Sequence, residues 1–108
     1  MQTVLEISVK EAQEQLSQNK PRPTLLDVRE DMEIAVCRIN GATHIPLHKL
    51  ENALEALPKE SPLLVYCHHG RRSLLAANYL NSKGFSAISI IGGIDAWAQH
   101  VDPSVARY

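Results

Sequence analysis

The chain has 108 residues, 44% of them hydrophobic and 21% charged, and a formal net charge of −1. This composition predicts one soluble globular domain over residues 1–108, and the near-neutral charge argues against general nucleic-acid binding. No apolar stretch approaches the roughly 18 residues of a membrane span, and residues 1–11 lack the basic and then apolar order of a signal peptide. We therefore expect a cytoplasmic protein that has no nucleic-acid or membrane partner.

The first half of the chain alternates between helical and strand patterns. A capping box formed by Ser8 and Glu11 begins the first helix, and the prolines of residues 20–23 end it. A continuous apolar run that contains one acid predicts a buried strand. The expected elements are a helix over residues 9–19, a strand over 24–28, a short helix starting within 30–33, a turn at Asn40-Gly41 and a short strand over 43–45.

The second half continues the alternation. Leucines spaced three or four residues apart place one apolar face on a second helix, which Pro58 closes. The strongest strand pattern ends at Cys67, and the helix after it is apolar on most sides, which predicts deep packing. The expected elements are a helix over residues 47–57, a strand over 63–67, a helix over 73–83 ended by Gly84, a strand over 87–91 and a short helix over 94–99.

This order of elements predicts an α/β fold with a parallel sheet covered on both faces. In such sheets ligands bind beyond the carboxyl ends of the strands, where helices begin. Cys67 is the last residue of its expected strand, so it lies at that edge of the sheet.

The segment "CHHGRRS", residues 67–73, surrounds one thiol with cationic and hydrogen-bonding groups. A loop wrapped over a helix N-terminus aims backbone N–H groups at one anion, and the arginines and any protonated histidine add positive potential. The glycine permits a backbone conformation that other residues resist, and the serine is the expected N-cap of the following helix. The predicted site residues are Cys67 as the nucleophile and, around it, His68, His69, Gly70, Arg71, Arg72 and Ser73.

A structural role is the alternative for Cys67, because a lone cysteine at a strand end is usually a small core residue. A purely structural thiol gains nothing from two adjacent histidines and two arginines, so we favour a site for a thiolate, a persulfide or a bound oxyanion. Cys37 and Cys67 are too few for a disulfide scaffold and are expected to be free in a reducing compartment.

With these motifs the sequence resembles the rhodanese-like sulfurtransferase family over nearly its whole length. The family's active loop has a cysteine, two residues, a glycine, one residue and an arginine, which is the order of residues 67–72. The tail, residues 101–108, is similar to rhodanese domains that stand alone or end ubiquitin-activating-type sulfur-transfer enzymes. The other matching segments are Asp27-Val28-Arg29-Glu30 with Glu33 as the second acid, the I-x-G-A-x-x-I-P stretch of residues 39–46 and the G-G-x-x-x-W ending of residues 92–97.

The resemblance implies a five-stranded parallel sheet and a two-step reaction without cofactor or metal. The Cys67 thiolate takes the outer sulfur of a donor such as thiosulfate and passes it, as a persulfide, to cyanide or a thiol. Arg71 is the candidate for attracting the anionic donor, while Arg72 pairs with either Asp27 or Glu33. A small anionic donor and a protein sulfur donor or acceptor are the implied partners. Asp27, Arg29 and Glu33 are the supporting residues.

The sequence departs from the family pattern at one position. The family commonly has Gly-His before the isoleucine, whereas this chain has Cys37-Arg38 before Ile39. That histidine is not the sulfur carrier, so the expected activity is unaffected. The second thiol is either an incidental, partly buried cysteine, which we favour, or a partner for exchange with Cys67.

Other readings of the loop concern phosphate and metal chemistry. Cysteine-dependent phosphatases and arsenate reductases place five residues between cysteine and arginine, and that position holds Ser73 here, so the loop is one residue short. A metal is not expected, because the adjacent His68 and His69 cannot easily point at one ion, and Pro46 interrupts a helix between His44 and His48.

Two further alternatives concern the role of the whole domain. A non-catalytic binding module is disfavoured, because Cys67, Gly70 and Arg72 are all present. A carrier that relays persulfide sulfur between proteins, with little thiosulfate activity, stays open. The two loop histidines either contact such a partner or are simply solvated. Trp97 is expected to be a core residue that closes the last helix onto the sheet.

Overall fold

Five short strands form one sheet in which every neighbouring pair is parallel. The computed structural model describes residues 5–108, and its sheet order is β1-β5-β4-β2-β3. The parallel α/β sheet expected from the sequence is therefore confirmed, with β4 at its centre. The strands are β1 Glu6–Ile7, β2 Thr24–Asp27, β3 Thr43–His44, β4 Leu63–Tyr66 and β5 Ala87–Ile90.

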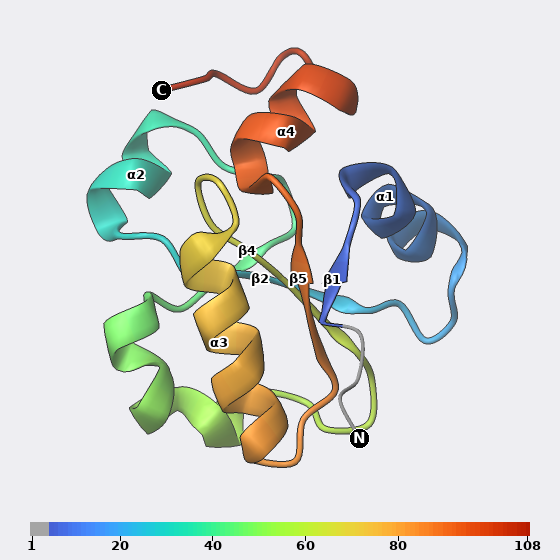
Figure 1. The fold of residues 1–108 in the computed structure, drawn as a ribbon, viewed down its shortest axis with the longest axis vertical. Helices are drawn as coiled ribbons and strands as arrows, with labels where there is room; N and C mark the ends of the chain where they lie inside the picture. The colour runs from blue at the N-terminus through green and yellow to red at the C-terminus, as the bar shows by residue number, and fades with distance from the viewer. Residues whose placement is uncertain (1–4) are drawn as a thin grey trace.

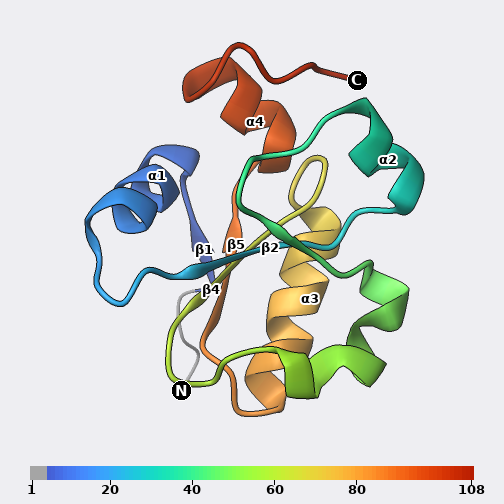
Figure 2. The same cartoon turned by 180° about the vertical axis from the view of Figure 1, so that it is seen from behind.

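Helices cover both faces of this sheet, as predicted (Figures 1 and 2). On one face α3 and a 3₁₀ helix, η1, pack over the central strands, and on the other face α1 and α4 do so. The capping box of Ser8 and Glu11 is present at the start of α1. The helices are α1 Val9–Gln18, α2 Asp31–Val36, η1 Leu47–Ala56, α3 Arg71–Ser82 and α4 Gly93–His100.

The central strand β4 is buried on both faces, because its side chains alternate between the two layers. Leu63 and Val65 point to the cluster under α3, and Leu64 and Tyr66 point to the cluster under α1 and α4. The same alternation turns Cys67, the next residue, toward α3. The register of the strand thus decides which helix the thiol faces.

Two expected helices differ from the structure in start or type. Ser73 is not an N-cap: α3 begins two residues earlier, at Arg71, because Gly70 adopts a left-handed conformation that turns the chain directly into the helix. The segment of residues 47–57 is a 3₁₀ helix rather than an α-helix. Pairs of its leucines are spaced three residues apart, which suits the three-residue turn, and Leu50 and Leu57 are buried as expected.

The edge strand β1 is missing from the elements expected along the chain. It contains only Glu6 and Ile7, and a two-residue strand carries no periodicity of its own. It forms by pairing with Ser89 and Ile90 of β5. Within residues 5–108 no helix combines the length and apolar character that crossing a bilayer requires.

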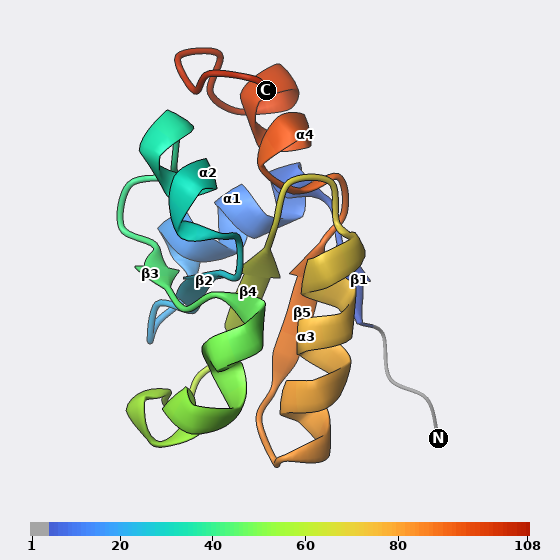
Figure 3. The same ribbon diagram turned by 90° about the vertical axis from the view of Figure 1, so that its left-hand side faces the viewer.

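The carboxyl ends of the strands meet at one end of the molecule. The loop that joins β4 to α3, the helix α2 and the start of α4 lie together there (Figure 3). The chain after α4 crosses this end toward α2 (Figures 1 and 2). This end therefore gathers the groups that the sequence singles out.

Candidate active site

The Cys67 loop, residues 67–72, wraps backbone N–H groups around the sulfur of Cys67. The Gly70 N–H donates to Sγ at 3.1 Å, and the Ser73 N–H, in the first turn of α3, donates at 3.3 Å. The Cys67 thiol in turn lies 3.5 Å from the Ser73 hydroxyl. Cys67 is 1% exposed. Two fixed donors on a buried sulfur stabilise a negative charge on it, as a loop over a helix N-terminus is expected to do.

Gly70 makes this turn possible. Its φ of 110° lies in the left-handed region, which residues with a Cβ resist. A Cβ at this position would also lie 3.2 Å from the backbone nitrogen of Gly92, so the loop and the turn after β5 are in close contact.

The Ser73 side chain holds the Cys67 loop in place, although Ser73 does not cap α3. Its hydroxyl donates to the Gly70 carbonyl at 3.1 Å and lies 2.7 Å from the hydroxyl of Ser89 on β5, which can donate to it. Both serines are completely buried. The pair thus ties the start of α3 to the neighbouring strand.

The first turn of α4 binds the outer side of the Cys67 loop. The Ile94 N–H donates to the Cys67 carbonyl at 2.8 Å, and the Asp95 N–H donates to the His68 carbonyl at 3.2 Å. Gly93 lies so close that a Cβ there would collide with both carbonyl groups. Because α4 takes these carbonyls, the loop is held with its N–H groups toward the sulfur.

Buried polar side chains collect at this end of the sheet. In the part of the chain that the structure describes, the buried polar or charged residues are Asp27, Arg29, Ser73 and Ser89. Burial of such groups is costly unless each finds partners. Asp27 pairs with Arg29 and Ser73 with Ser89, so these groups are satisfied at the end of the sheet where the candidate site lies.

Arg29 joins the strand β2 to the segment that follows α2. Its Nη2 donates to Asp27 Oδ2 at 2.8 Å and to the Cys37 carbonyl at 2.7 Å, and its Nε also donates to the Asp27 carboxylate. Burial opposes the charge, but the hydrogen bonds to Asp27 and to Tyr108 outweigh it and raise the pKa of Arg29 above its ordinary value. The guanidinium is a permanent, fixed cation.

Glu33, not Asp27, is the partner of Arg72. Arg72 donates to both oxygens of Glu33, at 2.6 and 2.9 Å, in a two-pronged ion pair. The hydrogen bonds from Arg72 lower the pKa of Glu33 to about 2, although partial burial opposes this. The sequence left this choice open, and the structure decides it because Asp27 already binds Arg29.

Arg71 contrasts with Arg72. It lies at the start of α3, is exposed, and makes none of the ion pairs seen among residues 5–108. Its charge is thus exposed to solvent at the Cys67 loop, where it adds positive potential.

Tyr108 enters this site from the far end of the chain. Its ring stacks on His68, with 3.8 Å between centroids and 9° between planes. Its hydroxyl accepts from Arg29 Nη1 at 2.8 Å and donates to Glu33 Oε2 at 2.7 Å. Sequence reasoning missed this residue, because no local pattern indicates a contact between positions so far apart.

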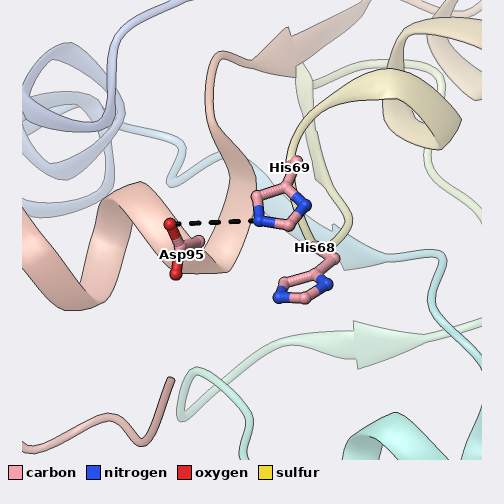
Figure 4. A group of neighbouring side chains, drawn as sticks. All are labelled: His68, His69 and Asp95. Atoms are coloured by element: carbon pink, nitrogen blue, oxygen red, sulfur yellow. Dashed lines mark ion pairs between the residues drawn. The ribbon is translucent and has the colours of Figure 1, made fainter. Parts of the chain in front are cut away.

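His68 and His69 of the Cys67 loop lie together with Asp95 of α4 (Figure 4). The atoms by which these three residues could bind a metal lie within 4.8 Å of one another. This is closer than we expect for two histidines that are adjacent in the sequence. The two imidazoles are stacked at 3.9 Å and 26°, which directs their nitrogen lone pairs along nearly parallel planes rather than to one point. Asp95 also binds Arg107 and Gln99. These contacts do not fit a tetrahedral metal centre.

Cys37 is separate from the Cys67 loop and free, like Cys67. It is the C-cap residue that follows α2, and the Arg29 side chain donates to its carbonyl and reaches its sulfur at 3.9 Å. It also lines a groove of about 580 Å³ together with Arg38, Trp97 and part of the tail. Trp97 is 7% exposed and packs in the core, as expected.

Comparison with known proteins agrees with this geometry. A profile of the Rhodanese-like domain matches residues 8–100. The chain belongs to the rhodanese-like sulfurtransferase family. A sulfurtransferase of Allochromatium vinosum is 37% identical to this rhodanese-like chain over 83 residues, which are 76% of the chain and 78% of that relative.

Two further similarities support the assignment of this rhodanese-like domain. The thiosulfate sulfurtransferase GlpE of Tolumonas auensis is 37% identical over 87 residues, covering 80% of the chain and 81% of the relative. The solved structure of a rhodanese-like domain protein from Staphylococcus aureus superposes with a TM-score of 0.82 at 29% identity, covering 95% of this chain and 97% of that one. The chain is therefore a rhodanese-like transferase in both sequence and fold.

Proposed function

We propose that this sulfurtransferase moves sulfane sulfur from a small anionic donor such as thiosulfate to a thiol or cyanide, through a persulfide on Cys67. The observation that carries the proposal is the pair of N–H donors, from Gly70 and Ser73, on a single buried sulfur. The same donors suit the terminal sulfur of a persulfide, which is also an anion. The name of the GlpE relative supports thiosulfate as the donor.

The reaction has two displacements. In the first, the Cys67 thiolate attacks the outer sulfur of thiosulfate, a sulfur–sulfur bond forms, and the bond to the sulfonate breaks to release sulfite. In the second, cyanide or a thiolate attacks the terminal sulfur of the persulfide and leaves with it, which returns the Cys67 thiolate. Charge and atoms balance in each step, so no oxidant, cofactor or metal is needed.

Two features of the loop support sulfur transfer over phosphate chemistry. A phosphatase loop holds its arginine against the phosphate, whereas Arg72 is engaged by both oxygens of Glu33. The sulfur of Cys67 is nearly inaccessible, and a slender terminal sulfur reaches such a position more readily than a bulky phosphate ester. The burial of the sulfur thus supports a sulfur substrate over a phosphate ester.

The first test measures the mass of the intact protein after incubation with thiosulfate and again after cyanide. We expect the parent chain to gain one sulfur atom and to lose it to cyanide as thiocyanate. Cys67→Ser should take up none, while the matched variant Cys37→Ser should behave like the parent, because Cys37 lies outside the loop. If Cys67→Ser takes up sulfur and Cys37→Ser does not, the sulfur carrier is Cys37 and the proposal is wrong.

A protein persulfide donor separates the transferase from a sulfur carrier. If thiosulfate loads no sulfur on the parent chain but a persulfidated protein does, the relay role replaces the thiosulfate reaction. If neither thiosulfate nor the persulfidated protein loads sulfur and the chain hydrolyses a phosphate ester, the proposed sulfur chemistry is wrong.

A further inference from the structure

The aromatic ring and the hydroxyl of Tyr108 contact two different parts of the site. The ring lies on His68, which belongs to the Cys67 loop. The hydroxyl lies between Arg29, which is completely buried, and Glu33, which holds Arg72. A tail residue that were merely packed on the surface would need neither contact.

The hydrogen bonds of the Tyr108 hydroxyl connect the buried Arg29 to the ion pair of Glu33 and Arg72. Asp27 and the Cys37 carbonyl immobilise Arg29 in the core. Through the Tyr108 hydroxyl, Arg29 fixes one oxygen of Glu33, the same oxygen that accepts from Arg72 Nη2. Arg72 directly precedes Ser73, whose N–H donates to the Cys67 sulfur, so the arginine charge belongs to the same turn that holds this sulfur. The position of the Arg72 charge relative to the sulfur therefore depends on the tyrosine.

The phenol is suited to this role at neutral pH. Burial and the Glu33 carboxylate raise the pKa of Tyr108 to about 12, although Arg29 opposes the rise. The hydroxyl therefore keeps its proton, donates it to Glu33 and still accepts from Arg29. A phenylalanine would keep the ring on His68 and lose both hydrogen bonds.

We propose that Tyr108 is a positioning residue of the sulfur-transfer site, which holds the Glu33–Arg72 pair so that the arginine charge favours anionic donors at Cys67. The proposal rests on the function proposed above. It places residues of the tail, which lie beyond the region matched by the family profile, within the working site.

The test compares two reagents of similar size that alkylate Cys67, anionic iodoacetate and neutral iodoacetamide. The ratio of their rates, read on the Cys67 peptide by mass spectrometry, reports the local potential, because access and thiolate content affect both reagents alike. We expect Tyr108→Phe to lower the iodoacetate preference by about threefold, because the partly exposed Arg72 charge is then no longer held in place near the sulfur. Uptake of sulfur from thiosulfate, which carries two negative charges, should fall by about tenfold.

Tyr79→Phe is the matched control. Tyr79 is a partly buried tyrosine on α3, and its hydroxyl makes none of the hydrogen bonds seen in the described chain. This variant should leave both rates unchanged. In an Arg72→Gln background, where the charge is already absent, Tyr108→Phe should have no further effect on the ratio.

An unchanged ratio in Tyr108→Phe, or an equal loss with and without Arg72, would overturn the proposal. The alkylation ratio needs no sulfur chemistry, so it is independent of the proposed reaction. If the parent chain takes up no sulfur from thiosulfate while the ratio responds as expected, the donor is wrong and the role of Tyr108 stands.

Discussion

Glu33 shows how much one carboxylate can organise. It accepts hydrogen bonds from Arg72, from the Tyr108 hydroxyl and from the backbone N–H of Glu30 at the start of α2. One residue thus joins a short helix, the Cys67 loop and the tail. Hydrogen bonds to a charged acceptor are stronger than neutral ones, so this junction is also sensitive to protonation.

Stability should therefore depend on acid through Glu33. Its pKa in the folded protein is about 2, below the ordinary 4.5. A lowered pKa gives stability that is complete above pH 4.5 and is lost as the pH falls toward 2. We expect Glu33→Gln to lower the free energy of unfolding by about 1 kcal/mol at pH 6, allowing for solvent screening, and by roughly half of that at pH 3.

Urea unfolding at the two pH values measures this difference. Glu14→Gln is the matched control, because Glu14 is an exposed carboxylate on α1 that forms none of the ion pairs seen in residues 5–108. Its difference from the parent should not change with pH. If Glu33→Gln lowers the free energy of unfolding by the same amount at pH 6 and at pH 3, the ion pair does not contribute to stability.

At the level of elements, α4 acts as a clamp on the Cys67 loop. The N–H groups of its second and third residues, Ile94 and Asp95, bind loop carbonyls, and the glycines at its start bring the backbones into contact. The N-terminus of α4 therefore holds the loop, whereas the N-terminus of α3 stabilises the charge on the sulfur. This division leaves the N–H groups of α3 available to the sulfur.

Gly93→Ala tests the clamp, with Gly84→Ala as its matched control. Both glycines have positive φ, 59° and 94°, so both alanines are strained, but only Gly93 lacks room for a Cβ. We expect Gly84→Ala to cost about 1 kcal/mol of unfolding free energy, and Gly93→Ala about 3 kcal/mol together with slower sulfur uptake. Urea unfolding and the mass assay measure these effects, and equal losses in the two variants would contradict close contact as the cause.

At the level of the whole molecule, the net charge of −1 gives no general attraction for an anionic donor. Attraction has to come from the local arrangement at the carboxyl ends of the strands. There the exposed Arg71 and the paired Arg72 lie four and five residues after Cys67, the proposed nucleophile. Screening by salt distinguishes such a local effect from direct contact.

Arg71→Gln should slow sulfur uptake from thiosulfate by about threefold at low ionic strength, and the difference should shrink as salt shortens the screening length. Arg22→Gln removes an exposed arginine before β2, at the opposite end of the sheet, and should have no effect at any salt concentration. Uptake rates measured across a series of salt concentrations decide this. A loss in Arg71→Gln that is independent of salt would indicate contact instead of attraction.

Sequence reasoning predicted the sheet, its parallel direction and the place of Cys67 at the carboxyl end of a strand, because alternating patterns and turn residues act locally. It did not find the start of α3 at Arg71 or the edge strand β1. The former depends on the left-handed conformation of Gly70, and the latter exists only through pairing with β5. Local patterns do not encode either cause.

Within the site, the sequence identified the loop but not all of its support. The choice between Asp27 and Glu33 for Arg72 depends on which acid is already engaged, and that is a property of the folded chain. Tyr108 and Ser89 reach the site through contacts across the fold. The roles in catalysis of the loop residues and of Asp27, Arg29 and Glu33 stay predictions.

Because all five strands run the same way, the connections that enter them lie at the end opposite Cys67. The turn of residues 58–62 before β4 is one of these, and Lys59 and Glu60 in it are exposed. Changes of chain length are tolerated best where they leave packed backbone untouched. A reporter peptide or a second domain can therefore be inserted between these two residues at a distance from the chemistry, which makes this turn the natural point for building a sulfur sensor from the protein.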